Sequence, residues 1–313
     1  MDDKLIKLTA KKQRLDSLRP LPLELVKNLD EWFKIELTYT SNAIEGNTLT
    51  RAETALVVEK GITVQGKSLK EHLEAANHAQ ALDYIKILVN KKRKNLTLND
   101  IFEIHRIILN KIEEENKGRF RTQHARIMGS KTILPNPLKV PNLMEEFIKW
   151  LQGQNTDHPI KIATDTHFKL VSIHPFVDGN GRTSRLLMNL LAMQEGYPPA
   201  IIRKEDRLDY INSLEKGQTT NDLTDYYNLL YEAFDRSLDI YLEALTPDRT
   251  SALPTLLEQR FYTTDEVADI LKVDPESVRR YVRRGKLKAI KLGGKFIRIE
   301  KKDLNNFINS LKT

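Results

Sequence analysis

The stretch from His174 to Arg185, HPFVDGNGRTSR, holds a histidine, a carboxylate, a glycine-rich turn and two arginines, and an apolar run follows it directly. Gly179 and Gly181 allow the backbone to curl around an anion, and Asn180 is a suitable cap for the helix that follows. The exposed amides of the first helical turn then point at phosphate oxygens, aided by the helix dipole. The pattern predicts a phosphate-binding loop at the start of a helix.

The charged side chains of this stretch suit a nucleoside triphosphate. Arg182 and Arg185 lie three residues apart, so they share a helix face and can both hold the same phosphates. Asp178 stands where it can hold a magnesium ion that bridges those phosphates. His174 is the group here whose unperturbed pKa lets it accept a proton near neutral pH. Because Pro175 disfavours helical geometry at the preceding residue, we expect His174 at a helix end.

This stretch resembles the signature of the Fic family, His-x-Phe-x-Asp/Glu-Gly-Asn-Gly-Arg-x-x-Arg, and all eight specified positions match. The resemblance implies a mainly α fold, an all-helical bundle with a short β-hairpin flap. It also implies transfer of AMP from ATP to a Tyr, Thr or Ser hydroxyl of a protein target, with Mg²⁺ held by Asp178 and His174 as the catalytic base. The nucleotide site would then comprise Asp178, Gly179, Asn180, Gly181, Arg182, Thr183, Ser184 and Arg185.

Other chemistries of the same family stay open. Some relatives transfer a phosphate and carry a lysine near the second glycine of the loop, and Gly181 argues against that reaction. Others move UMP or phosphocholine, and some remove AMP again. The mass added to a modified protein would distinguish these reactions.

A second motif lies upstream, in a stretch that reads as helical from residue 23 onward. Ser41, Glu45 and Gly46 resemble the inhibitory motif Ser/Thr-x-x-x-Glu-Gly/Asn of many Fic proteins. Four residues apart on a helix, Ser41 and Glu45 face the same way. The resemblance implies that Glu45 pairs with Arg185 and crowds the terminal phosphate of ATP, so that the enzyme is autoinhibited. The alternative is a solvated glutamate ahead of a glycine cap.

Two further segments resemble the family more loosely. Residues 126–137 combine β-formers, a Gly-Ser turn and prolines, which suits a short hairpin. This segment would be the flap over the nucleotide, with contacts from Ile127, Met128, Gly129 and Ser130. Tyr210 would border the adenine, although core packing explains it equally well. Gln218 falls where relatives often carry an asparagine, and His167 is expected to be a buried structural histidine.

Composition limits the remaining classes of function. The chain has 313 residues and no cysteine, which excludes disulfides and thiol catalysis. No run of about twenty apolar residues occurs, and the charged N-terminus lacks the apolar core of a signal peptide, so we expect a cytoplasmic protein without membrane contact. The formal net charge is +7, and residues 276–302 carry eleven Lys and Arg against two acids. The basic character therefore belongs to one C-terminal segment.

That segment predicts a helix, a turn, a second helix, a hairpin around Gly293-Gly294 and a last helix. The order resembles the winged helix-turn-helix of excisionase and MerR-type proteins, which implies binding of double-stranded DNA. The expected DNA contacts are Arg279, Arg280, Arg283 and Arg284 on the second helix, with Lys291, Lys295 and Arg298 on the wing. A basic surface that binds an acidic protein is the alternative.

The expected domain organisation follows from these segments. We expect an N-terminal helical region with the inhibitory motif (1–94), a Fic catalytic domain (95–245), a linker (246–259) and a winged helix-turn-helix domain (260–313). The catalytic helices are expected at 98–109, 143–151, 160–173, 183–194 and 223–245, the 183–194 helix being central and buried because it is apolar almost all round. The expected partners are a protein target with a hydroxyl side chain and DNA, and a homodimer stays open. Self-modification and removal of AMP also stay open, as does a DNA-binding regulator whose Fic domain is a nucleotide sensor.

Overall fold

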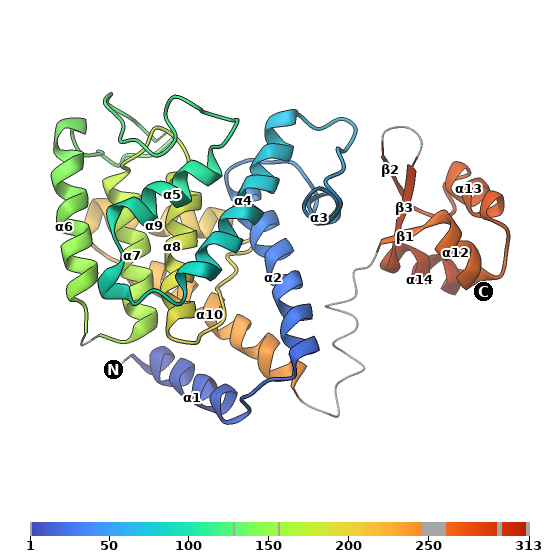
Figure 1. The fold of residues 1–313 in the computed structure, drawn as a ribbon, viewed down its shortest axis with the longest axis horizontal. Helices are drawn as coiled ribbons and strands as arrows, with labels where there is room; N and C mark the ends of the chain where they lie inside the picture. Colours follow the sequence, from blue (N-terminus) through green and yellow to red (C-terminus); the bar gives the residue numbers. More distant parts are fainter. Residues whose placement is uncertain (1, 128, 156, 246–260, 293–295, 311–313) are drawn as a thin grey trace.

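The structure is a computed structural model that describes residues 2–127, 129–155, 157–245, 261–292 and 296–310. Its described part up to residue 245 is α-helical, which confirms the predicted fold class (Figure 1). The helices are α1 (Asp3–Ser17), α2 (Leu23–Ile44), α3 (Arg51–Lys60), α4 (Leu69–Leu88), α5 (Leu98–Ile108), α6 (Val140–Gly153), α7 (Pro159–Ile173), α8 (Asn180–Gln194), α9 (Arg207–Thr220) and α10 (Thr224–Ala244). Two short 3-10 turns, Arg93–Asn95 and Pro137–Lys139, precede α5 and α6. No helix in the described ranges has the length and apolar character that crossing a membrane requires.

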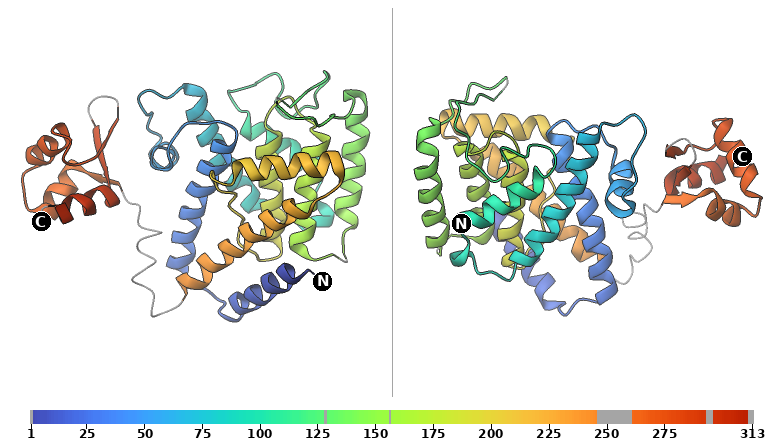
Figure 2. Two further views of the ribbon diagram at one scale, coloured as in Figure 1. Left: turned by 180° about the vertical axis from the view of Figure 1, so that it is seen from behind. Right: turned by 45° about the horizontal axis from the view of Figure 1, so that its top comes forward.

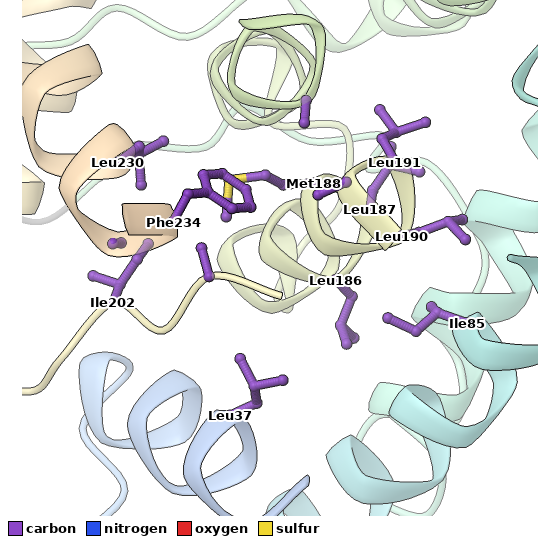
Figure 3. Close-up of a cluster of buried hydrophobic side chains, with 14 of the residues drawn as sticks. Leu37, Ile85, Leu186, Leu187, Met188, Leu190, Leu191, Ile202, Leu230 and Phe234 are labelled. Carbon is purple, nitrogen blue, oxygen red and sulfur yellow. The ribbon is translucent and has the colours of Figure 1, made fainter. Parts of the chain in front are cut away.

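Helix α8 lies at the centre of the bundle, as its sequence predicts. Its apolar side chains point in all directions and are almost fully buried, among them Leu186, Leu187, Met188, Leu190 and Leu191 (Figure 3). They meet side chains from α2, α4 and α10, namely Leu37, Ile85, Leu230 and Phe234. Because close-packed surroundings hold α8 on every side, its N-terminus is a rigid place for a binding site.

Helix α1 is an element that we did not predict. Its apolar side chains Leu5, Leu8 and Leu15 are buried, and it packs along α10. Lysines on its outer face pair with acids of α10, as Lys11 does with Asp235 and Asp239 at 2.6 Å. Seen from behind, α9 and α10 cover the bundle, with α1 below α10 (Figure 2). The helical spacing of its three leucines is hard to recognise in the sequence because many charged residues lie between them.

The expected N-terminal region shares its main core with the rest of the helical body and adds a small cluster of its own around Leu56, Val57 and Val64. Leu29, Phe33 and Leu37 of α2, and Leu82 and Ile85 of α4, belong to the same hydrophobic core as α8. Residues 1–94 and 95–245 therefore pack as one body. Helix α2 also runs further than the 23–37 pattern shows and carries the inhibitory motif on its last turns.

The C-terminal part forms a small α/β unit. Strands β1 (Phe261–Thr263), β2 (Ile290–Leu292) and β3 (Phe296–Glu300) make an antiparallel sheet in the order β1-β3-β2. Helices α12 (Thr264–Leu271), α13 (Pro275–Arg283) and α14 (Lys301–Ser310) enclose a core that includes Val267, Val278, Leu287, Ile299 and Phe307. The predicted helix order is present, and β1 is an additional strand. The Gly293-Gly294 turn and Lys295 lie outside the described residues.

The arginines of α13 are exposed as expected, but Glu276 neutralises part of their charge. Arg279 lies 3.3 Å from Glu276, and Arg283 also pairs with that carboxylate. Arg280 and Arg284 are exposed without an ion pair among the described residues. On the wing, Lys291 of β2 lies opposite Ile297 of β3. Arg298 of β3 lies opposite Ile290 of β2 on one side and Thr263 of β1 on the other.

Candidate active site

His174 ends helix α7 and begins the loop that leads to α8. Its backbone N–H donates to the carbonyl of Leu170, and its φ of 49° and ψ of 59° place it in the left-handed region. This conformation is uncommon for a residue with a side chain, and Pro175 prevents the helix from continuing. The expectation that the histidine lies at a helix end is confirmed.

The loop is closed by Asn180, in a way that differs from our expectation. The N-cap of α8 is Gly179, with φ 77°, and Asn180 is the first helical residue. The Asn180 side chain accepts from the N–H of Phe176 and donates to its carbonyl, both at 2.9 Å. Its amide is therefore used to hold the loop in shape. The prediction of Asn180 as the helix cap was wrong, because the cap position is left-handed, a conformation that Gly179 adopts without strain.

His105 of α5 supports this loop, and sequence reasoning missed it. Its ring stacks on Phe176, with centroids 3.7 Å apart and planes within 10°. The N–H of Gly118 donates to His105 Nδ1 at 2.8 Å, so Nε2 carries the proton and donates to the carbonyl of Asp178 at 2.9 Å. Burial lowers the pKa of His105 to about 4, which keeps the ring neutral. A side chain at Gly179 would press against this ring.

The side chains of Thr183 and Ser184 face the protein interior. Both residues are fully buried, and the Ser184 hydroxyl donates to the carbonyl of Asn180 within the helix at 2.7 Å. The Thr183 N–H is likewise used by the carbonyl of Gly179 at 2.9 Å. These two side chains therefore lie in the interior, and their binding of nucleotide stays a prediction. Their small size lets α8 pack closely at its first turn.

Arg182 and Asp178 form a charged cluster with Glu74 of α4. The guanidinium of Arg182 is 2% exposed and lies 3.3 Å from Glu74 and 3.4 Å from Asp178. Within the described residues, Nε and Nη1 of Arg182 are buried without a hydrogen bond, although Nη1 is the atom that pairs with Glu74. Asp178 is the exposed member, and its Oδ1 accepts from the N–H of Gly179 at 2.6 Å. Glu74 gave no signal in the sequence.

Arg185 is buried and contacts both residues of the upstream motif. Its Nε donates to the Ser41 hydroxyl at 3.0 Å, and its Nη2 donates to the Ser41 carbonyl at 2.9 Å and to Glu45 Oε1 at 2.7 Å. Burial lowers the pKa of Arg185, but Glu45 and Tyr210 together outweigh burial and raise it above its ordinary value. The predicted contact of Ser41 and Glu45 with Arg185 is confirmed. The two arginines of the motif thus have different partners, Glu74 and Glu45.

The Glu45 carboxylate also lies over the start of α8. A methyl group added at Gly181 would collide with Glu45 Oε1 and lie 3.0 Å from Arg185 Nη1. Glu45 is the C-cap of α2, and Gly46 follows with φ 100°, so the glycine-cap alternative is correct about the backbone. The side chain, 38% exposed, nonetheless turns onto Arg185 instead of solvent. It occupies the place at a helix N-terminus that suits an anion.

Tyr210 and His167 lie beneath Arg185. Tyr210 is 1% exposed, and its hydroxyl lies 2.8 Å from His167 Nε2 and 3.5 Å from Arg185 Nη1. His167 Nδ1 meets the hydroxyl of Tyr226 at 2.8 Å, and burial lowers the pKa of His167 to about 3. The geometry favours core packing for Tyr210 over an adenine contact, and it confirms His167 as a structural histidine.

The expected flap is a loop without strands in its described residues. Ser130 donates from its N–H to the carbonyl of Ile127 at 3.1 Å across Gly129, while Met128 lies outside the described residues. The hairpin prediction was wrong because side chains accept from the amides that a ladder would use. Lys131 N–H donates to Glu215 and Thr132 N–H to the Ser130 hydroxyl. Gln218 of α9 accepts from the Thr132 hydroxyl at 2.8 Å, which fastens the loop to α9.

The fold and the site together define an α-helical protein with a candidate anion site at a buried helix N-terminus beside a histidine. A profile of the Fic/DOC family matches residues 95–192, and one of a helix-turn-helix domain matches residues 261–312. The solved structure of Fic-1 from C. elegans is 30% identical, with a TM-score of 0.71, and the match covers 77% of this chain and 72% of that one. A Fic domain containing signaling protein from Bacteroides thetaiotaomicron is also 30% identical, with a TM-score of 0.68 over 77% of this chain and 97% of that one.

The chain belongs to the Fic/DOC family. Among curated proteins it is similar to the protein adenylyltransferase Fic of Nematostella vectensis, 37% identical over 242 residues. That match covers 77% of this chain and 56% of the relative, so the chain spans about half the length of the curated relatives it matches.

Proposed function

We propose that the chain is a protein adenylyltransferase that moves AMP from ATP to a Tyr, Thr or Ser hydroxyl of a protein target. One observation carries the proposal: His174 stands beside the glycine-rich N-terminus of a buried helix whose Arg185 can hold a terminal phosphate. The names of the curated relatives support the same reaction. The sequence leads us to expect a cytoplasmic enzyme. Its nucleotide substrate would be ATP.

The roles of the residues follow from their positions. His174 would accept the proton of the target hydroxyl, whose oxygen forms a bond to the α-phosphorus while the bond to pyrophosphate breaks. The amides at the start of α8 would hold phosphate oxygens, and Arg182 and Arg185 would neutralise the charge that leaves with pyrophosphate. Positioning and charge stabilisation supply most of the catalysis in transfers of this kind.

The residues fit a magnesium ion held mainly by the substrate. Asp178 has an exposed carboxylate at the mouth of the anion loop, and the described residues offer no cluster of three acids or histidines. Mg²⁺ is ordinarily bound by one or two carboxylates plus phosphates and water, so a single Asp178 is sufficient. When bound, the ion would neutralise charge on the phosphates.

The same proposal includes control by Glu45. With Glu45 on Arg185 and over Gly181, the terminal phosphate cannot take the position that the motif offers it. ATP would then bind in a pose unsuited to attack on the α-phosphorus. Two related reactions belong to the same proposal: modification of the enzyme by itself, and removal of AMP with the help of Glu45.

The mass added to a modified protein tests the reaction type. Incubation of the Glu45→Gly variant with ATP and a cell extract, followed by intact-mass and peptide analysis, should show a gain of one AMP. A gain of UMP, phosphate or phosphocholine instead would replace the proposed reaction by another chemistry of the family.

A second activity is proposed for the C-terminal unit, residues 260–313, which we separate from the helical body by a linker over 246–259. The helix-turn-helix match and the exposed Arg280 and Arg284 favour binding of double-stranded DNA. If this activity stands alone, the chain is a DNA-binding regulator with a nucleotide-sensing Fic domain. A homodimer would suit either proposal.

DNA binding should weaken steeply as salt concentration rises, because binding releases condensed cations from DNA and this release is less favourable at high salt. The Arg280→Ala variant is expected to bind less tightly and to lower the salt slope by about 1, whereas Lys27→Ala, on α2, should change neither. Fluorescence anisotropy with a labelled duplex measures both quantities. Absence of binding at low salt would rule out the DNA proposal and favour an acidic protein partner.

A further inference from the structure

Arg121 is a buried cation whose three side-chain nitrogens each donate to a backbone carbonyl. It is 2% exposed. Its Nε donates to the carbonyl of His174 at 2.8 Å, its Nη1 to that of Gln123 at 3.1 Å, and its Nη2 to that of Pro135 at 2.6 Å. No described carboxylate forms an ion pair with it, and burial lowers its pKa. Burial of a charge without a counterion costs free energy. The hydrogen bonds of Arg121 therefore indicate a structural role in the site.

The three carbonyls belong to two segments of the site. One is that of His174, the proposed base, and the other two bracket the loop that we expected to be the flap. The backbone N–H of Arg121 adds a bond to the carbonyl of Pro175 at 2.9 Å. Three residues upstream, Gly118 holds the His105 ring that donates to Asp178. The segment 118–121 therefore anchors the loop of His174 at both ends.

We propose that Arg121 is a positioning residue that holds the catalytic histidine and the loop 122–136 in one fixed arrangement. The inference rests on the proposed function, because it assigns His174 as the base. A planar guanidinium has five donors in a rigid fork and can serve three carbonyls at once, whereas a lysine ammonium is a point charge on a flexible stem. His174 needs such support, since its left-handed conformation persists only where neighbours impose it.

The charge of Arg121 also affects the proton affinity of His174. Burial first, and then Arg121, lower the pKa of His174, while the Val171 carbonyl, Glu45 and Asp178 raise it. A base must be neutral to accept a proton, so a lowered pKa keeps His174 active as pH falls. Removing the charge of Arg121 should raise the pKa of His174 and move the acidic limb of the rate profile to higher pH.

The test compares Arg121→Gln and Arg121→Lys in the Glu45→Gly protein. For Arg121→Gln we expect kcat to fall about 100-fold while KM for ATP changes less than about threefold, because misplacement of the base affects the chemical step. The acidic limb of the rate profile should move to higher pH in Arg121→Gln. In Arg121→Lys it should stay in place because the charge is kept, although kcat should fall. Arg119→Gln, an exposed neighbour, is the matched control with parental values.

A second measurement does not depend on activity. Cleavage after Lys131 by a lysine-specific protease should be faster in both Arg121 variants, since the loop ends at Gln123 and Pro135 are released, and unchanged in Arg119→Gln. If Arg121→Lys has the same kcat and the same cleavage rate as the Glu45→Gly parent, the positioning role is overturned. This comparison holds even if Arg121→Gln does not fold. If the Glu45→Gly parent transfers nothing, the proposed function fails, and the cleavage rates then decide the role of Arg121 alone.

Discussion

Replacement of His174 by alanine is expected to reduce transfer of AMP at least about 1,000-fold in the Glu45→Gly protein, because the general base is lost. Binding of ATP should remain within a few-fold of the parent, since the anion site is formed by the start of α8 and by Arg185. Rates of label transfer and nucleotide affinities measured on the same preparations separate the two effects. Residual transfer within about tenfold of the parent would show that another group takes the proton.

The pH dependence of the parent supplies a second check on His174. Burial and Arg121 lower the pKa of this histidine below its ordinary value, so the neutral, active form persists to lower pH. Activity should therefore hold as pH falls through about 6.5 and be lost only at lower pH, where the imidazole takes up a proton. An acidic limb above the ordinary histidine pKa would contradict the assignment.

Replacement of Glu45 by glycine is expected to raise transfer about 10- to 100-fold over the wild-type protein. The change removes the carboxylate from Arg185 Nη2 and clears the space over Gly181, so the terminal phosphate can pair with the guanidinium. Initial rates with ATP over a range of concentrations measure the effect. Glu45→Gln, which keeps the size of the side chain and removes its charge, should lie between the wild type and Glu45→Gly.

Helix α8 offers a matched control for this variant. Glu195 is its C-cap and precedes Gly196 with φ 75°, just as Glu45 is the C-cap of α2 and precedes Gly46. Glu195→Gly introduces the same glycine pair at the opposite end of α8 from the anion site, where the Glu195 side chain is 43% exposed. It should leave transfer at the wild-type level. Equal activation by both variants would assign the effect to helix fraying instead of the loss of the Glu45 contact.

The sequence predicted the parts of the site that are local. The motif from His174 to Arg185 is contiguous, and four-residue spacing on a helix directs Ser41 and Glu45 to one side. Both predictions led to contacts that the structure contains. The central position of α8 followed in the same way from its apolar residues.

The parts that were missed act through long-range contacts with the backbone. His105 and Arg121 hold carbonyls of the 174–178 loop from other segments, and Glu74 reaches Arg182 from α4. No spacing in one sequence reveals such partners, because they share no element with the motif. The flap prediction failed for a related reason, since Glu215 of α9 accepts from an amide that a hairpin would use.

The most direct test of the account uses ATP radiolabelled either at the α- or at the γ-phosphorus, incubated with the Glu45→Gly protein in cell extract. Relative to extract without the added protein, the account predicts new protein bands labelled from the α-position and no new bands labelled from the γ-position. It also predicts far weaker labelling by the wild type and by Glu195→Gly, and none by Glu45→Gly combined with His174→Ala. New bands labelled from the γ-position, or equal labelling with His174 replaced, would contradict a histidine-dependent AMP transfer restrained by Glu45.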